Sequence, residues 1–163
     1  MSTNNDLYRF SPITSKDQFD EAIAYVVREA ARLSKELTGT ELHLGSVKIF
    51  SHYPKEWEFM QSIIEQYGTR SSVGRSTSIY VDTDLDIEGC HITLLGIRVP
   101  DPYRSQVGCG DYALDNAKGF ISSLPAHPHG YVRPFPDMPE TFIELWHPDF
   151  DVAGYIDLGI DGK

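Results

Sequence analysis

The chain has 163 residues, of which 40% are hydrophobic and 12% aromatic, so it is long enough for one domain with its own core and does not read as a disordered protein. Its net charge of −10 argues against nucleic acid and anionic membranes as partners, because both draw on clustered Lys and Arg, whereas a small anionic molecule needs only one or two Arg residues. The sequence shows no signal peptide, no apolar run of the roughly 20 residues that span a membrane, and only two cysteines, which together predict a cytoplasmic protein with reduced thiols.

Residues 1–14 are expected to form a loose N-terminal arm, followed by a long helix over residues 15–38. Ser15 is the predicted N-cap with Gln18 as its capping-box partner, and Gly39 ends the helix. Apolar residues recur at helical spacing, which indicates that one face of this helix packs on a core. They are Phe19, Ile23, Val26, Ala30, Leu33 and Leu37.

A first unit is expected over residues 41–99. Strands are predicted at residues 42–50 and 76–83, with a helix between them that Pro54 opens and Gly68 ends. Residues 69–75 are expected to be loop, and residues 84–88 an acidic turn. The predicted buried stripe of the helix is Trp57, Met60, Ile63, Ile64 and Tyr67.

The central stretch, residues 89–115, reads as two strands joined by a proline-bounded turn. Because side chains alternate along a strand, His91 and Leu95 are expected on one face of the first strand, and Ile92 and Arg98 on the other. The second strand carries Cys109 and Asp111 on one face and Tyr112 on the other.

A second unit is expected over residues 106–158, with a short helix at 115–124 and strands at 131–135, 141–147 and 152–158. The loop at 125–130 is rich in proline. Glu144 shares a face with Phe142 and Trp146. The predicted fold is therefore α+β: a leading helix and two βαββ(β) units that form one curved mixed sheet within a single domain, residues 15–163.

This element order, with the strand-turn-helix HLGSVKIFSHYPKEW and the segment ITLLGIRVPDP, resembles the vicinal oxygen chelate (glyoxalase-like) superfamily, nearest to its YecM-type branch. The resemblance implies a cup-shaped sheet that holds a ligand. It also implies a divalent metal bound by a His on the first strand and a Glu on the last strand of each half.

The metal positions carried over from that resemblance are, in chain order, Leu44 (or His43, one step away), Arg98, Cys109 and Glu144. An Arg among metal ligands would repel the cation, so we expect a cup without the metal and no cofactor. A divalent-metal enzyme that uses His43, Asp111 and Glu144 in a shifted register is the weaker alternative.

The first functional hypothesis is a protein that binds a small anionic compound, with lyase or isomerase chemistry if it is catalytic. Arg98 would bind a carboxylate or phosphate, Glu144 and His43 would transfer protons, and Cys109 would be a reactive thiol. The further ligand-binding candidates are His91, Asp111, Tyr112 and Trp146. The competing interpretations are an Arg98–Glu144 salt bridge and a buried, inert cysteine.

The second hypothesis is a non-catalytic protein that sequesters a ligand or docks on a partner, and a homodimer is left open. His91 with Thr93 matches only one half of the paired H-x-T motif of two-histidine phosphoesterases. His127 and His129 are either a two-point metal site or surface histidines in a proline-rich loop. The sequence has no glycine-rich phosphate loop, G-x-S-x-G, C-x-x-C or H-E-x-x-H motif.

Overall fold

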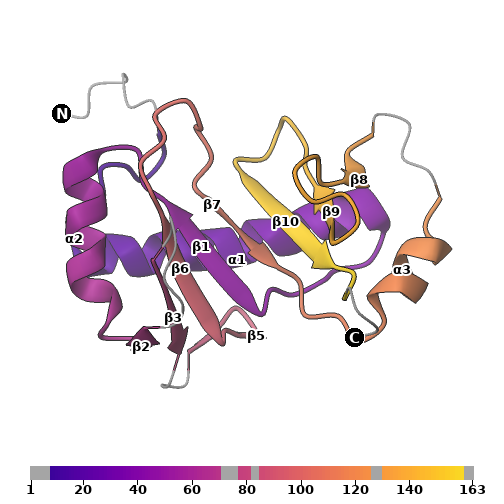
Figure 1. Cartoon of the computed structure of the whole chain (residues 1–163), viewed down its shortest axis with the longest axis horizontal. Coiled ribbons are helices and arrows are strands. Elements are labelled where there is room, and N and C mark those ends of the chain that lie inside the picture. Colours follow the sequence, from indigo (N-terminus) through magenta and orange to yellow (C-terminus); the bar gives the residue numbers. More distant parts are fainter. Residues whose placement is uncertain (1–7, 71–76, 82–84, 126–129, 160–163) are drawn as a thin grey trace.

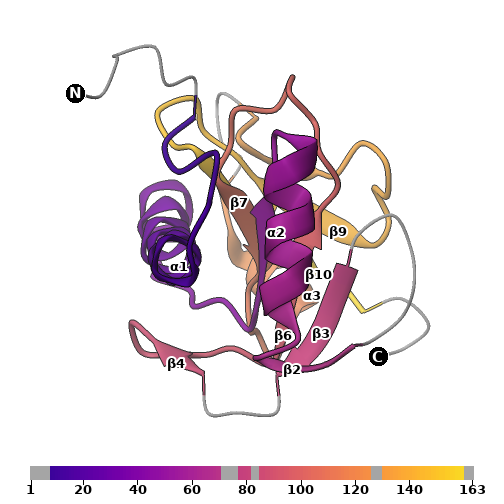
Figure 2. The same cartoon turned by 90° about the vertical axis from the view of Figure 1, so that its left-hand side faces the viewer.

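The computed structural model describes residues 8–70, 77–81, 85–125 and 130–159. In this part of the chain a large mixed sheet carries two helices on one face (Figure 1, Figure 2). The prediction of an α+β protein with a leading helix is confirmed. The pair His127 and His129 lies outside the described residues.

The helices are α1 (Lys16–Thr38), α2 (Pro54–Ile64) and α3 (Ala117–Ser123). The strands of the large sheet are β1 (Ser46–Phe50), β2 (Gly68–Arg70), β3 (Thr77–Val81), β6 (Leu94–Arg98), β7 (Gly108–Asp111), β8 (Val132–Pro134), β9 (Phe142–Leu145) and β10 (Val152–Asp157). A separate hairpin pairs β4 (Asp86–Ile87) with β5 (Cys90–His91). No helix in the described ranges is both long and apolar enough to cross a bilayer.

Helix α1 forms as its sequence predicts. Ser15 Oγ accepts the backbone N–H of Gln18 at 3.2 Å, while the Gln18 side chain reaches back to the backbone N–H of Thr14 at 2.8 Å. Gly39 caps the other end in the left-handed conformation, φ +80°. The predicted apolar stripe is buried from Phe19 to Leu33, so its burial against the sheet anchors the helix.

The strand order in the large sheet is β2-β3-β6-β1-β7-β10-β9-β8. Strand β1 runs parallel to β6, and β7 runs parallel to β10, whereas every other pair of neighbours is antiparallel. Strands β1 and β7 therefore lie side by side at the centre, although about sixty residues separate them in the sequence.

Alternation gives the sheet two different faces. Leu95 and Ile97 of β6 are buried on the face that packs against the helices. Arg98 of the same strand, with Cys109 and Asp111 of β7, faces the opposite side, where it lines a cavity. The predicted alternation is confirmed for residues 94–98 and for the second strand, whereas residues 91 and 92 depart from it.

Tyr112 lies on the helix side of the sheet. Its hydroxyl donates to the carbonyl of Ala30 in α1 at 2.7 Å, and its ring covers Gly154 of β10. A Cβ at Gly154 would overlap that ring, so the position of the Tyr112 side chain requires a glycine at residue 154. The prediction that Tyr112 contacts a ligand in the cup is wrong, because its side chain is buried against α1.

Three local predictions need correction. Residues 68–70, expected to end a helix and begin a loop, form β2 on the edge of the sheet. The acidic turn of residues 84–88 includes β4, and Glu88 and Gly89 close its hairpin with positive φ angles of 51° and 81°. The predicted strand of residues 89–98 is interrupted at Ile92, whose N–H bonds to Leu85 and whose side chain is fully buried rather than on the face of Arg98.

Candidate functional site

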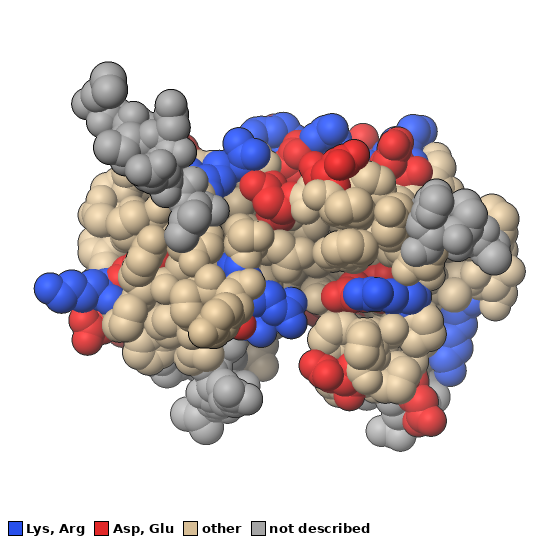
Figure 3. Space-filling model, turned by 90° about the horizontal axis from the view of Figure 1, so that it is seen from above, with Lys and Arg blue, Asp and Glu red and all other residues tan. Residues whose placement is uncertain are grey.

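The sheet face opposite α1 and α2 is hollowed by a cavity of about 380 Å³, here called the cup. Its floor is formed by side chains of β1, β6, β7 and β10, the four central strands. Viewed from above, the molecule is notched between the half that carries α2 and the half that carries α3, with charged side chains along the notch (Figure 3). The volume is that of a small-molecule site.

Three cationic side chains line the cup. Lys48 comes from β1, Arg98 from β6 and Arg104 from the loop between β6 and β7. In the described part of the chain, none of the three has a carboxylate within ion-pair distance. Arg98 instead lies over the ring of Phe50, with 4.8 Å between its guanidinium carbon and the ring centroid. With two carboxylates, Asp111 and Asp137, against three cations, the cup therefore presents an excess of positive charge.

Asp111 lies among these cations on β7. Burial raises the pKa of its carboxyl group above the ordinary value, and the negative charge of Asp157 raises it further. Lys48 and the hydroxyl of Ser46 act in the opposite direction. Asp111 thus combines a position in the cup with a weakened preference for the ionised form.

Cys109 neighbours Asp111 on the same face. Burial raises the pKa of its thiol to about 12, and the nearby charges of Lys48, Arg98 and Arg104 reduce this effect without cancelling it. The thiol is therefore protonated at neutral pH, and a nucleophilic role would require a ligand or partner group to lower its pKa.

A partly buried hydrogen-bond network begins at the far wall of the cup. The hydroxyl of Tyr155 donates to Glu144 Oε2 at 3.0 Å, and burial raises the pKa of that hydroxyl. Arg133 donates through Nε and Nη2 to Glu144 Oε1, both at 3.1 Å. Glu144 is only 5% exposed, so each of its oxygens is paired in a setting where an unpaired carboxylate would be costly.

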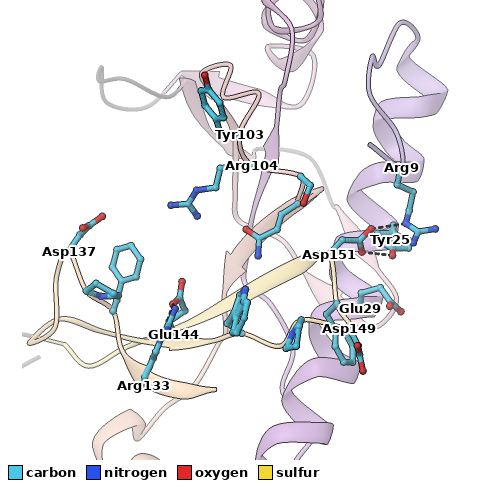
Figure 4. A pocket seen from close by; sticks show the side chains of 17 residues that line it. Arg9, Tyr25, Glu29, Tyr103, Arg104, Arg133, Asp137, Glu144, Asp149 and Asp151 are labelled. Atoms are coloured by element: carbon cyan, nitrogen blue, oxygen red, sulfur yellow. Dashed lines mark hydrogen bonds and ion pairs between the residues drawn. The ribbon is translucent and has the colours of Figure 1, made fainter. Parts of the chain in front are cut away.

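Beyond this network lies a second cavity of about 690 Å³, here called the outer cavity (Figure 4). Figure 4 shows Tyr103 and Arg104 on the loop above it and Arg133 and Glu144 on the strands below. Arg9 and Tyr25 bond to Asp151 along one side, at 2.8 and 2.5 Å. Trp146 also lines the cavity.

The predicted site residues divide among three places. Arg98, Cys109 and Asp111 meet in the cup, whereas Glu144 and Trp146 line the outer cavity. Neither His43, with Nδ1 3.4 Å from the sulfur of Cys90, nor His91, paired with Asp86 at 2.8 Å, is among the residues that line these two cavities.

The predicted pairing of Arg98 with Glu144 is wrong, because the cation that binds Glu144 is Arg133. The sheet order explains the difference. Arg98 is on β6 and Glu144 is on β9, and β1, β7 and β10 lie between them. Four steps of about 4.8 Å put the two strands roughly 19 Å apart along the sheet. Glu144 is also not on the last strand, which is β10.

Lys48, Arg104, Arg133 and Tyr155 are functional candidates that the sequence did not single out. Lys48 could have been found, since it is the one charged residue in the apolar strand SVKIF and alternates with the buried Val47 and Ile49. Arg104 carried no such signal, because it lies on a loop, and the sequence does not show where a loop places its side chains.

The donor set does not fit the divalent metal that the superfamily resemblance implies. Lys48 and Arg98 project into the cup from β1 and β6. His43, Asp111 and Glu144, the alternative ligand set, do not share one cavity. Within the described ranges no three His, Cys, Asp or Glu side chains are placed to hold a metal ion. No chemical step is therefore assigned to a metal.

No protein-family model matches the chain, and no curated protein matches it. A solved structure named "Structural Genomics, Protein EC4020" is similar, with a TM-score of 0.62 and 13% sequence identity. The match covers 91% of this chain and 90% of that one. At this identity the similarity shows a shared fold, over almost the whole length of both chains.

Proposed function

We propose that this is a small-molecule-binding protein of the glyoxalase-like type whose cup binds a small anionic compound without a metal. The observation that carries the proposal is the excess of positive charge in the cup, where Lys48, Arg98 and Arg104 form no ion pair among the described residues and outnumber the two carboxylates that line the same cavity. A bound carboxylate or phosphate would complete charge-assisted hydrogen bonds that the protein leaves unmade.

The strand pairing supports the glyoxalase-like assignment. From the centre outward, one half of the sheet reads β1, β6, β3, β2 and the other reads β7, β10, β9, β8. In each half the first pair is parallel and the next two pairs are antiparallel. Two βαββ(β) units in the same arrangement would give this pattern, with the cup where they meet.

A catalytic role is the second candidate, and Asp111 favours it. A carboxyl group whose pKa is raised lies closer to the operating pH of a general acid or base than an ordinary aspartate does. Beside a bound anion it could abstract a proton while Lys48 or Arg98 stabilises the negative charge that develops. This is the chemistry of a lyase or isomerase. Glu144, our sequence-based candidate for the base, is less suited because both of its oxygens already accept hydrogen bonds.

Thermal unfolding in the presence of small anions tests anion binding. Phosphate, sulfate, malonate and pyruvate are each added to the wild-type protein and to Arg98→Ala. A matched control is Arg28→Ala, which removes an exposed arginine from α1 and leaves the cup intact. We expect at least one anion to raise the melting temperature of the wild type and the control but not of Arg98→Ala. Equal shifts in all three proteins, or none, would remove the basis of the proposal.

Turnover separates the two candidates. An anion identified in this way is incubated with the protein in D₂O, and exchange of the hydrogen next to its carboxylate is followed by NMR. Exchange that is lost in Asp111→Asn supports proton abstraction. Tight binding with no exchange supports a protein that only sequesters its ligand.

A further inference from the structure

The cup and the outer cavity adjoin each other. Arg104, Phe135 and Asp137 line both, so the two spaces share one wall. The hydrogen bond from Tyr155, which lines the cup, to Glu144, which lines the outer cavity, connects their floors. One ligand of sufficient length could therefore occupy both.

The two cavities differ in the sign of their charge. Cations outnumber carboxylates three to two in the cup, whereas carboxylates outnumber cations five to three in the outer cavity. Asp151 and Glu144 are satisfied by Arg9 and Arg133. Glu29 is paired with Arg32, and Asp149 Oδ2 lies 3.9 Å from His147 Nδ1. Among the described residues, Asp137 has no Lys or Arg within ion-pair distance. The outer cavity thus favours a positively charged group.

The outer cavity also offers aromatic surface. Trp146 is partly buried and is held by Tyr131 at 5.5 Å between ring centroids and by Arg133 above its ring. Phe135, in the shared wall, meets the ring of Tyr155 edge-on at 5.2 Å. Rings held in this way are suited to stack on a planar group, and a cation gains further from an aromatic face.

We propose that the ligand has two parts: a phosphate or carboxylate that binds in the cup, and a planar cationic group that lies in the outer cavity against Trp146. This inference rests on the proposed function, because the anionic part is the compound assigned to the cup. It adds that the outer cavity is a second binding region for the same molecule and that Asp137 and Trp146 determine which molecule is accepted.

Isothermal titration calorimetry with matched probes tests this. The probes are inorganic phosphate; thiamine, which carries a planar cationic thiazolium ring; histidinol, which carries a planar imidazole ring and a separate ammonium group; and the phosphate esters of both (thiamine monophosphate and histidinol phosphate). Joining the two parts makes the second contact intramolecular. We expect at least one ester to bind ten times or more tightly than either phosphate or the corresponding cation.

Variants test whether the higher affinity of the ester comes from contacts in the outer cavity. Trp146→Ala should remove most of the advantage of the ester while leaving the affinity for inorganic phosphate unchanged. Asp137→Asn should also reduce the advantage of the ester, but it should raise the affinity for phosphate, because Asp137 lines the cup as well. Trp57→Phe is the matched control, since Trp57 lies on α2 and lines neither cavity. Arg98→Ala should weaken the binding of phosphate and of both esters.

The outcomes separate the two proposals. If phosphate binds and depends on Arg98, but neither ester binds more tightly than phosphate, the two-part ligand is wrong and the anion site stands. The same conclusion follows if the advantage of the ester survives in Trp146→Ala. If neither phosphate nor any ester binds, the proposed function fails, and the two-part ligand fails with it.

Discussion

The cup and the outer cavity share one wall, yet their charged groups are arranged differently. In the cup, Lys48 and Arg98 form no ion pair among the described residues, although the charge of Lys48 acts on Asp111. In the outer cavity, Arg133 is joined to Glu144 and Arg9 is joined to Asp151. Paired charges hold a structure together, whereas an excess of unpaired positive charge in a cavity costs stability and can be compensated by a bound anion. The comparison marks the cup as the primary binding region and the walls of the outer cavity as supports.

The largest expected effect is on anion affinity. Replacing Arg98 with Ala should weaken binding of an anion in the cup by roughly 10- to 100-fold, the value of one charge-assisted contact. Replacing Arg133 with Ala should change that affinity by less than about 3-fold, because its guanidinium serves Glu144. Calorimetric titration of both variants checks this. Equal losses would mean that the two cavities are not distinct.

The next effect is on stability, and the order of the two variants is reversed. Arg133→Ala should lower the free energy of unfolding by about 1–2 kcal/mol, because it leaves the buried carboxylate of Glu144 with Tyr155 alone. Arg98→Ala should leave stability unchanged or raise it slightly. Urea unfolding measures both. In the double variant Arg133→Ala/Glu144→Gln, part of the loss should be recovered, and a purely additive result would contradict the network.

Asp111→Asn should make the protein more stable at neutral pH. The pKa of Asp111 is raised in the folded state, so its contribution to stability is full below the unfolded value of 3.8 and is lost as pH rises through the folded pKa. The Asn side chain does not ionise and therefore does not lose this stability, so we expect the melting temperature of Asp111→Asn to be higher than that of the wild type by about 2 °C or more at pH 7. The rise should disappear near pH 3. A fall at pH 7 would show that Asp111 stabilises the fold.

The smallest expected effect concerns the segment that carries Arg9 to the outer cavity. His52, 3% exposed, is stacked on Tyr8 with 3.8 Å between ring centroids, and its Nδ1 lies 2.6 Å from Ser11 Oγ. Burial lowers the pKa of His52. Its contribution to stability is therefore present above the unfolded value of 6.5 and is lost as pH falls through the folded pKa.

The protection of residues 8–13 against amide hydrogen exchange, relative to the intrinsic rate at each pH, should consequently decrease on acidification below about pH 6.5, while the protection of β1 and β7 stays constant. In His52→Gln this pH dependence should be reduced. If β1 and β7 respond together with residues 8–13, the segment beside the outer cavity and the central strands of the cup unfold as one unit. The two cavities would then not differ in local stability.

The sequence predicted those features that depend on near neighbours in the chain. The cap at Ser15, the apolar stripe from Phe19 to Leu33 and the left-handed Gly39 define α1 within one stretch of sequence. The alternation of Cys109 and Asp111 against Tyr112 likewise predicted which faces of the sheet these residues occupy. Local periodicity carries this information because a helix or strand repeats within a few residues.

Only the tertiary structure decided which charges meet. The sequence identified Arg98 and Glu144 but could not show that three strands lie between theirs, or that Arg133 on the neighbouring strand is the partner of Glu144. It also gave no means of bringing Lys48 and Arg104 to the same cavity. Strand order depends on burial summed over the whole core and not on any local pattern, so the cup exists only once β1 and β7 have paired.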